Sequence, residues 1–441
     1  MGYIKKTFSN IKLQYSKNRS VVKNSAWIIA DKIYIMIVGV VVTALIARYF
    51  GAEQYGVFSY SLSIVTIFTA FSTLGLPVLT VKSLVDKEFS ENEIMSSSLI
   101  LRFIGSVLLM GLALLTITIL EPNDTKYTII VLILSLSMTF KSFEVIDYWL
   151  QTYHLAKVSS IIKIISYTLI SVLKIGVIVT ARNLYIYSML YTFDALINGI
   201  FLLFAYIMLK KKNFRFKLSK VYMKYILSNS WYLIISGLMI SIYMQIDKIM
   251  LGVMLTNKVQ VGLYSVATQI AQMWFFIPMA IITSMQPVIL NAKKTNLLIY
   301  KDKMRALYRI ITILGVIFGL FIVLFSSLII NLLYGKEYAQ AASILTISVW
   351  AGTFAILGSA RNIWLISENL QRYTIAFMGI GAIVNVILNY TLIPLLNGYG
   401  AAIATLISQV VVVIFAPLIW KKTRTSTILI VSSLYKMKRS K

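Results

Sequence analysis

The sequence predicts an all-α polytopic membrane protein with about twelve transmembrane helices in two six-helix pseudo-repeats. Of its 441 residues, 59% are hydrophobic and only 13% are charged, and the mean hydropathy is +0.83. Such a chain has too few polar residues to cover a surface that faces water. Apolar runs long enough to cross roughly 30 Å of hydrocarbon, about 20 residues each, recur along nearly the whole chain. The fold class therefore follows from composition and from the repeated run length.

Short polar breaks separate the predicted spans, and they are rich in residues that form turns. Four of them are "RYFGAEQYG" at 48–56, "EPNDTK" at 121–126, "LYGKEY" at 333–338 and "NGYG" at 397–400, and all four fall on the same side of the membrane. In chain order, the twelve spans are expected near residues 25–49, 57–81, 94–120, 126–150, 156–181, 185–209, 223–252, 262–291, 306–333, 338–366, 371–395 and 398–420.

The basic residues are distributed very unequally between the two sides of the membrane. If the N-terminus is cytoplasmic, 30 of the 42 Lys and Arg residues lie on the cytoplasmic side, and five, Arg48, Lys126, Arg182, Lys258 and Lys336, lie outside. The positive-inside rule then predicts a multi-pass protein with both termini in the cytoplasm. We interpret the net charge of +27 as a topology signal with attraction to anionic lipid, and not as a sign of nucleic-acid binding.

Weak internal repeats favour a design in two lobes. "NSAW" at 24–27 is echoed by "NSW" at 229–231, and "YGVFSYS" at 55–61 by "VGLYSVA" at 261–267. An even number of spans in each half relates the halves as parallel repeats. The segment 426–435 is too short to span, so an interfacial or frayed helix is expected there. The predicted organisation is a basic arm at 1–24, a lobe at 25–209, a basic linker at 210–224, a lobe at 225–420 and a basic tail at 421–441.

The chain offers little material for bond chemistry. It has no Cys and one His, which excludes disulfides, thiolate metal sites and Cys-His nucleophile pairs. We therefore predict neither enzyme activity nor a cofactor or bound metal. The first 24 residues lack the apolar core and cleavage site of a removable signal peptide, so the first span is expected to direct insertion.

Twelve charged residues fall inside the predicted spans. Each costs about 2.5–3.5 kcal/mol at a helix centre, so they are expected to face a protein interior or a wet cavity. Bases outnumber acids, which predicts a mildly electropositive cavity and an anionic cargo, for example a lipid pyrophosphate, whose oxygens accept charge-assisted hydrogen bonds. The bases are Lys32, Arg102, Lys141, Lys163, Lys174, Lys248 and Arg361, and the acids are Asp31, Glu144, Asp147, Asp194 and Asp247.

The spacing of these charges leaves two interpretations open. Lys141, Glu144 and Asp147 are three residues apart and share one helix face, as expected of a cavity wall. Several others lie close enough to a predicted cytoplasmic boundary to snorkel: Asp31, Lys32, Arg102, Asp147, Lys163 and Arg361. Desolvated carboxylates could exchange protons during a transport cycle, whereas pairing with Lys would keep them ionised, and the sequence leaves both open.

Other polar residues and prolines within the spans also permit two interpretations. The amides Gln269, Gln272, Gln286, Asn385 and Asn389 could bind sugar hydroxyls or join helices to one another. Pro278 and Pro287 predict a bend or break in the eighth span, either as a moving element or as a fixed kink.

Two stretches resemble a known family. "NSAWIIADKIYIMIVGVVVTALIARYFGAEQYGVFSYSLSIVTIFTAFSTLGL" at 24–76 and "IDKIMLGVMLTNKVQVGLYSVATQI" at 246–270 resemble the polysaccharide-transport flippases, the Wzx-type O-antigen and capsule translocases. The likeness covers nearly the whole chain. It is most specific at Ala47-Arg48-Tyr49, Gly51, Tyr55-Gly56, Leu74-Gly75, Asp247-Lys248 and Gly262-Leu263-Tyr264.

The resemblance implies a transporter of the multidrug/oligosaccharidyl-lipid/polysaccharide (MOP) exporter superfamily, with two six-helix bundles forming a V around a cationic cavity. Such a protein moves undecaprenyl-pyrophosphate-linked oligosaccharide, the unit of O-antigen in lipopolysaccharide or of capsule, from the cytoplasmic to the periplasmic leaflet of the bacterial inner membrane. It works by alternating access, without bond chemistry, coupled to an H⁺ or Na⁺ gradient. The implied partners are this lipid-linked substrate, the phospholipid bilayer, a polysaccharide polymerase and a chain-length regulator, and no nucleic acid.

Two alternatives remain. A multidrug/cation antiporter of the same superfamily would need an acidic, aromatic cavity, which the excess of bases disfavours. A membrane polysaccharide polymerase or glycosyltransferase would need a large external loop, and none is predicted. Our candidate substrate-binding residues are Lys32, Arg102, Lys141, Lys174 and Arg361, and our candidates for ion coupling or gating are Asp31, Glu144, Asp147, Asp194, Asp247 and Lys248.

Overall fold

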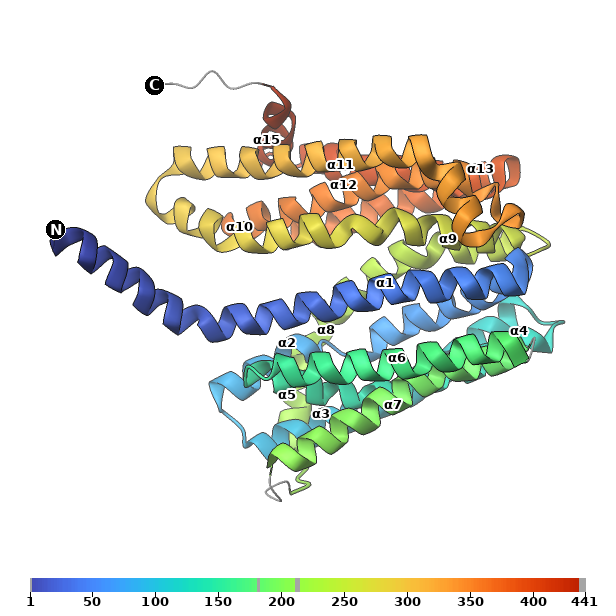
Figure 1. Ribbon diagram of the computed structural model, residues 1–441, viewed down its shortest axis with the longest axis horizontal. Coiled ribbons are helices and arrows are strands. Elements are labelled where there is room, and N and C mark those ends of the chain that lie inside the picture. Colours follow the sequence, from blue (N-terminus) through green and yellow to red (C-terminus); the bar gives the residue numbers. More distant parts are fainter. Residues whose placement is uncertain (1, 181–182, 211–214, 436–441) are drawn as a thin grey trace. The chain divides into compact units, whose positions relative to one another are not determined.

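The computed structural model describes residues 2–180, 183–210 and 215–435, with side chains from Ala26 onward except at 178–179 (Figure 1). Every regular element in these ranges is helical, which confirms the predicted all-α class. Arg182, part of the basic linker (211–214) and the end of the basic tail (436–441) lie outside the described residues.

The helices follow one another through short connections. They are α1 (Gly2–Ser72), α2 (Leu76–Asp86), α3 (Glu91–Leu120), α4 (Thr125–Phe140), η1 (Lys141–Glu144), α5 (Val145–Thr152), α6 (Ala156–Thr180), α7 (Leu184–Lys210), α8 (Lys220–Met254), α9 (Val259–Gln272), η2 (Met273–Phe275), α10 (Phe276–Thr295), α11 (Leu297–Tyr334), η3 (Lys336–Tyr338), α12 (Ala341–Ser367), α13 (Tyr373–Val410), the π-helical turn η4 (Val411–Phe415), α14 (Ala416–Ile419) and α15 (Arg424–Leu434).

Ten helical stretches of the described chain are long and apolar enough to cross a membrane, and two of them supply two crossings each. The stretch Ala26–Asp86 has 61 residues. At 1.5 Å per residue it would extend about 90 Å, three times the hydrocarbon thickness. It is broken at Gly51 (φ 78°, ψ 167°), and the stretch Tyr373–Ile419 is broken at Asn397 (φ 52°, ψ −134°). Both breaks fall within predicted turns. If each of these two stretches crosses the membrane twice, the ten stretches give the twelve spans that the sequence predicts.

The predicted cytoplasmic break between the eighth and ninth spans is shorter than expected. Only Asn296 separates α10 from α11, because its side chain accepts hydrogen bonds from the N–H groups of Leu298 (2.8 Å) and Ile299 (3.3 Å) and so starts a new helix at once.

The two prolines of the predicted eighth span have unequal effects on the helix. Pro287 lies inside the continuous helix α10, whereas Pro278 lies in the first turn of α10, where a proline is tolerated, and the 3₁₀ turn η2 precedes that helix.

The chain forms two compact units. The first unit comprises Met1–Val42 and Phe68–Gly237, and the second comprises Thr43–Ile67 and Leu238–Lys441. Helices α1 and α8 therefore contribute residues to both units. The predicted lobes at 25–209 and 225–420 stay a prediction.

In the first unit, α4 packs between α3 and α7, and α6 packs on α7 (Figure 1). Glu91 at the start of α3 connects this helix to the end of α5 and to the end of α7. Its carboxylate accepts hydrogen bonds from Trp149 Nε1 (2.5 Å) and the Tyr153 hydroxyl (2.9 Å) and pairs with Lys210 Nζ (2.6 Å). Burial and the bond to Glu91 raise the pKa of Tyr153 to about 12, so its hydroxyl stays a donor at neutral pH. These contacts fix α5, and with it the short helix η1 that precedes it.

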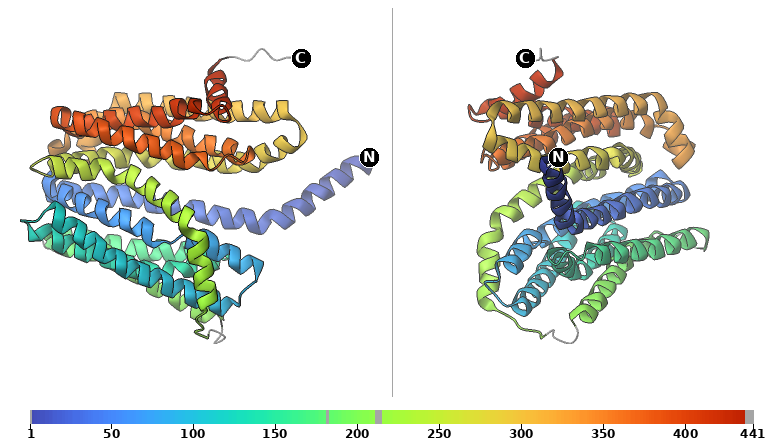
Figure 2. Two further views of the ribbon diagram at one scale, coloured as in Figure 1. Left: turned by 180° about the vertical axis from the view of Figure 1, so that it is seen from behind. Right: turned by 60° about the vertical axis from the view of Figure 1, so that its left-hand side comes forward.

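In the second unit, α12 is the central helix and packs against α9, α11 and α13. Close approach to α11 is possible because Gly315 and Gly319 face Thr353 and Trp350 of α12. The outer face of α11 is apolar and exposed, as expected of a surface in lipid. Helix α15, which overlaps the predicted interfacial segment, lies across α11 (Figure 2). It is held there by Arg309 Nε, which donates to the Ser433 carbonyl (2.8 Å).

One helix ending occurs in both units. "WLQTYHL" ends α5 and "WLISENL" ends α12, with their tryptophans 215 residues apart. In each, the sixth residue, His154 or Asn369, has a φ of 57°. In each, the final Leu donates its N–H to the Leu carbonyl five residues back at 2.8 Å, which is a Schellman ending. This match adds to the sequence repeats near residues 24 and 55.

Candidate functional site

Two cavities in the described part of the chain, one in each unit, are lined by six of the twelve charged residues singled out above. The first, which we name the charged cavity, has a volume of about 190 Å³ and lies within the first unit. Its wall comes from α1, α4, η1, α6 and α7. It is lined by Ile35, Phe140, Lys141, Glu144, Lys163, Ser166, Tyr167, Tyr191, Asp194, Ala195, Asn198 and Gly199.

Local structure explains why Lys141 and Glu144 reach this cavity together. They are the first and last residues of the 3₁₀ helix η1, in which residues three apart are eclipsed. Gly199 of α7 lets η1 approach closely, because a Cβ atom there would lie 2.8 Å from the Phe143 ring. Of the three residues predicted to share a face, Lys141 and Glu144 line this cavity together through a tighter helix than expected, whereas Asp147, in α5, does not line it.

Two of the basic residues around the charged cavity are neutralised by carboxylates. Arg102 is 1% exposed, and it pairs with Glu144 (2.8 Å) and donates to the Tyr148 hydroxyl (2.9 Å). Lys163 pairs with Asp147 at 2.8 Å. Asp147 accepts further hydrogen bonds from Gln151 (3.0 Å) and Ser159. These pairs leave Arg102 and Lys163 with little charge to offer a ligand.

Lys141 and Lys174 differ from them. Among the described residues, neither makes an ion pair. The Lys141 ammonium lies 5.7 Å from the centre of the Tyr191 ring, and Lys174, 7% exposed, lies 5.8 Å from the same ring. Two further tyrosine rings surround Lys174 at about 6 Å. Cation–π contacts stabilise an ammonium without cancelling its charge. Lys141 therefore presents an unneutralised positive charge to the charged cavity, with Asp194 as another lining residue.

Three predicted site residues lie elsewhere. Lys32 is exposed on α1, and Asp31 is 4% exposed and accepts a hydrogen bond from Ser160 (2.7 Å). Arg361 is fully buried in the core of the second unit and lines neither cavity. Its guanidinium donates to the Val412 carbonyl (2.6 Å), which belongs to the π-helical turn η4, and lies 4.6 Å from the Phe377 ring centre. The structure thus gathers Arg102, Lys141 and Lys174, whereas Lys32 is exposed on α1 and Arg361 belongs to the core of the second unit.

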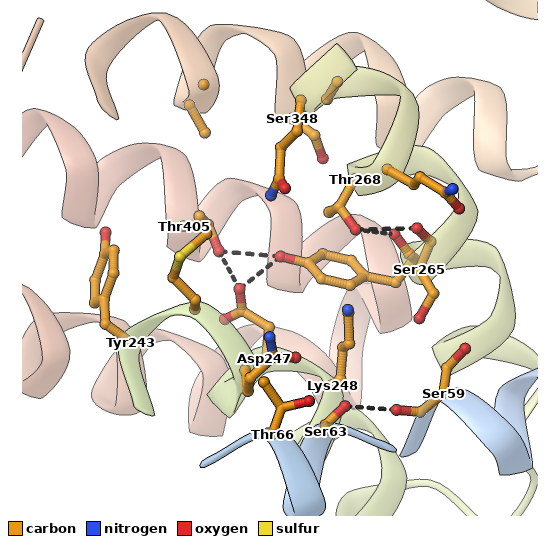
Figure 3. Close-up of a pocket in the computed structure, with 18 of the residues that line it drawn as sticks. Ser59, Ser63, Thr66, Tyr243, Asp247, Lys248, Ser265, Thr268, Ser348 and Thr405 are labelled. Carbon is orange, nitrogen blue, oxygen red and sulfur yellow. Dashed lines mark hydrogen bonds between the residues drawn. The ribbon is translucent and has the colours of Figure 1, made fainter. Parts of the chain in front are cut away.

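The second cavity, which we name the hydroxyl cavity, has a volume of about 320 Å³ and lies within the second unit (Figure 3). Asp247 is at its edge, 4% exposed, and its carboxylate accepts four hydrogen bonds. The donors are the Asn385 amide (3.0 Å), the Asn389 amide (2.7 Å), the Tyr264 hydroxyl (2.5 Å) and the Thr405 hydroxyl (2.6 Å). All four are neutral, and the side-chain oxygen of Asn389 is buried with no hydrogen-bond partner.

Lys248 of α8 also lines the hydroxyl cavity, close to Asp247 (Figure 3). Of the predicted amides, Gln269 and Gln272 line this cavity, whereas Gln286 does not. Sequence reasoning missed Gln245, Gln409 and Thr405, which also line it. No sequence signal distinguished them, because a single Gln or Thr in an apolar helix is common as a helix–helix contact.

Comparisons with known proteins agree with this architecture. Residues 21–293 match the family model described as "Polysaccharide biosynthesis protein". No curated protein matches the chain. Among solved structures, the chain is similar to the lipid II flippase MurJ in an inward closed conformation, with a TM-score of 0.69 and 15% identity over 94% of this chain and 91% of that one.

It is also similar to an inward-facing multidrug resistance MATE family transporter of the MOP superfamily, with a TM-score of 0.66 and 13% identity over 95% of this chain and 96% of that one. An outward-facing MATE transporter gives a TM-score of 0.61 and 14% identity over 94% and 97%. At these identities the likeness shows the fold. This multi-pass membrane protein therefore belongs to the polysaccharide biosynthesis protein family and has the fold of the MOP-superfamily transporters.

Proposed function

We propose that this chain is a flippase that carries an undecaprenyl-pyrophosphate-linked oligosaccharide from the cytoplasmic to the periplasmic leaflet of the bacterial inner membrane by alternating access. The family and the fold support a flippase or transporter of a lipid-linked substrate. The observation that favours an anionic head group is the unpaired Lys141 ammonium in the charged cavity. Two bases and two acids line this cavity. Arg102, Lys174 and Asp147, which contact lining residues, bring the total around it to four bases and three acids.

In this proposal, Lys141 donates directly to a pyrophosphate oxygen. Lys174 adds positive charge from behind the Tyr191 ring, while the pairs Arg102–Glu144 and Lys163–Asp147 hold the wall in place. The charged cavity is small, since 190 Å³ is below the roughly 300–1,000 Å³ typical of pockets for drug-sized ligands. In this proposal it therefore holds the pyrophosphate group alone. Lys32 and Arg361 have no direct contact with the head group in this scheme.

The proposed flippase is tested by deleting the gene in a strain whose surface polysaccharide depends on it. Loss of polymer is expected, with lipid-linked units accumulating on the cytoplasmic side, and a plasmid-borne wild-type gene should restore export. Unchanged polymer after deletion, together with increased sensitivity to cationic drugs, would instead support the multidrug antiporter, which the excess of bases around the charged cavity disfavours. Polymer chains that fail to extend although their units have crossed the membrane would support a polymerase.

We further propose that Asp247 couples transport to an ion gradient. It is an ionisable group whose four hydrogen-bond donors are neutral, so that a Na⁺ ion or a proton could replace some of these hydrogen bonds. The partnerless oxygen of Asn389 beside it is a further ligand of the type that Na⁺ prefers.

Asp247→Asn keeps the shape of this group and removes its charge. In proteoliposomes, we expect transport by this variant to become independent of an imposed Na⁺ or H⁺ gradient, since no charge remains to be neutralised. Ser408→Ala is the matched control, because Ser408 bonds Tyr243 in the same unit and makes no contact with Asp247. Gradient dependence equal to that of wild type in Asp247→Asn would remove Asp247 from the coupling mechanism.

A further inference from the structure

The hydroxyl cavity differs chemically from the charged cavity. Its polar wall is mostly neutral, with hydroxyl groups from Thr43–Ile67, α9 and α12 and amides from α8, α9 and α13. Asp247 is occupied by its four donors, which leaves Lys248 as the cation of this wall within the described chain. At about 320 Å³ the cavity also reaches the lower end of the range for organic ligands.

The hydroxyl groups of this wall present acceptors more than donors. Ser63 donates to the Ser59 carbonyl (2.6 Å), and Thr66 donates to the Leu62 carbonyl (2.7 Å) (Figure 3). Thr268 and Ser348 likewise donate to carbonyls one turn back, each at 2.8 Å. Because each proton is committed to the helix backbone, the lone pairs remain for a ligand. An ionised phosphate, which only accepts hydrogen bonds, fits such a wall poorly, whereas a ligand rich in hydroxyl donors fits it well.

Four glutamines supply the complementary groups. They come from three different helices, and none of their side-chain amides makes a hydrogen bond to another described residue. The four are Gln245, Gln269, Gln272 and Gln409. Each amide offers two donor hydrogens and an acceptor oxygen, which allows paired hydrogen bonds to neighbouring hydroxyl groups. Three aromatic rings, Tyr55, Phe58 and Phe275, line the same cavity and offer flat apolar surface to the C–H faces of a sugar ring.

We propose that the hydroxyl cavity is the subsite for the saccharide of the lipid-linked substrate, and that it sets which sugars are accepted. This inference rests on the proposed flippase function and concerns the sugar alone. Gln269 and Gln272, one helical turn apart on α9, are its central donors, and Lys248 contributes further donors to sugar oxygens.

The test measures binding of two lipids to the purified protein in nanodiscs. One lipid is undecaprenyl pyrophosphate, and the other is undecaprenyl pyrophosphate bearing the oligosaccharide extracted from the deletion strain. The double variant Gln269→Leu/Gln272→Leu keeps side-chain size and removes both amides. We expect its affinity for the glycosylated lipid to fall about tenfold or more, since two hydrogen bonds are lost, with unchanged affinity for the bare lipid. Gln286→Leu, outside the cavity, is the matched control and should bind both lipids as wild type does.

Each other result has a distinct meaning. An equal loss for both lipids would assign the cavity to the pyrophosphate or to stability, and no loss for either would show that it is not a ligand site. Wild-type protein that binds both lipids equally would overturn the saccharide subsite but leave the flippase standing. Wild-type protein that binds neither lipid would overturn the proposed function itself.

Discussion

Lys141→Ala is expected to lower the rate of substrate transport about 10- to 100-fold at unchanged protein level. A hydrogen bond to a charged group contributes about 1.5–3 kcal/mol, and 1.4 kcal/mol corresponds to a factor of ten. Lys141 is the base that lines the charged cavity without an ion pair in the described chain, and Lys174, which does not line the cavity, cannot replace its direct hydrogen bond. The measurement is surface polymer in the complemented deletion strain, together with transport of fluorescent lipid-linked substrate in proteoliposomes.

Two variants control for this effect. Lys82→Ala removes an exposed lysine of α2 and should transport as wild type does. Lys141→Arg retains the charge and should retain part of the activity, although its planar group fits the site differently. Full transport by Lys141→Ala, with normal membrane insertion, would make Lys141 part of the architecture and would leave the head group without its proposed partner.

Gly56→Ala is expected to lower the thermal unfolding midpoint of the detergent-purified protein by several degrees and to abolish transport. A Cβ atom at Gly56 would lie 1.8 Å from the Lys258 carbonyl oxygen, and one at Gly262 would lie 2.1 Å from the Ala52 carbonyl oxygen. The segment Thr43–Ile67 thus meets the start of α9 through two glycines with backbone against backbone. Neither partner is a side chain that can rotate away, so the cost is expected to be at or above the 1–3 kcal/mol typical of overpacking.

The chain provides its own reference for this experiment. Gly111 also lies within a helix, but a Cβ atom there would have no neighbour within 4 Å. Gly111→Ala should be neutral or slightly stabilising, because alanine favours a helix over glycine by about 1 kcal/mol. If Gly56→Ala melts at the temperature of Gly111→Ala, the close backbone contact at Gly56 is not part of the folded protein.

The parts of the fold that could be predicted depend on local signals. Apolar run length gave the number of crossings, and the turn signals around Gly51 and Asn397 gave the two tight reversals. The three-residue spacing of Lys141 and Glu144 placed them on one face for either helix type. The family followed from short motifs such as those near Tyr55 and Asp247 and is confirmed by the family model.

Other features had no sequence signal. The partner of Arg361 is a backbone carbonyl in the π-helical turn η4, and neither the turn nor its bond to Arg361 is encoded in side-chain spacing. The pairing of Arg102 with Glu144 joins residues 42 positions apart, and only the packing of α3 against η1 determines it. The hydroxyl cavity was not predicted, because serines and threonines are ordinary residues of membrane helices. Only the structure shows that their hydroxyl groups line one cavity and donate to backbone carbonyls.

The ending shared by α5 and α12 indicates how these two chemistries came to reside in one chain. Its tryptophans, Trp149 and Trp364, align the two halves residue by residue, so Glu144 corresponds to Ser359 and Asp147 to Asn362. The helix ending is the same in both copies, whereas the carboxylates that pair with Arg102 and Lys163 exist in only one. The two halves thus share a backbone ending but not the side chains before it, as expected if a half-transporter was duplicated and its copies then diverged. Selection on new cargoes could then alter one half without rebuilding the other.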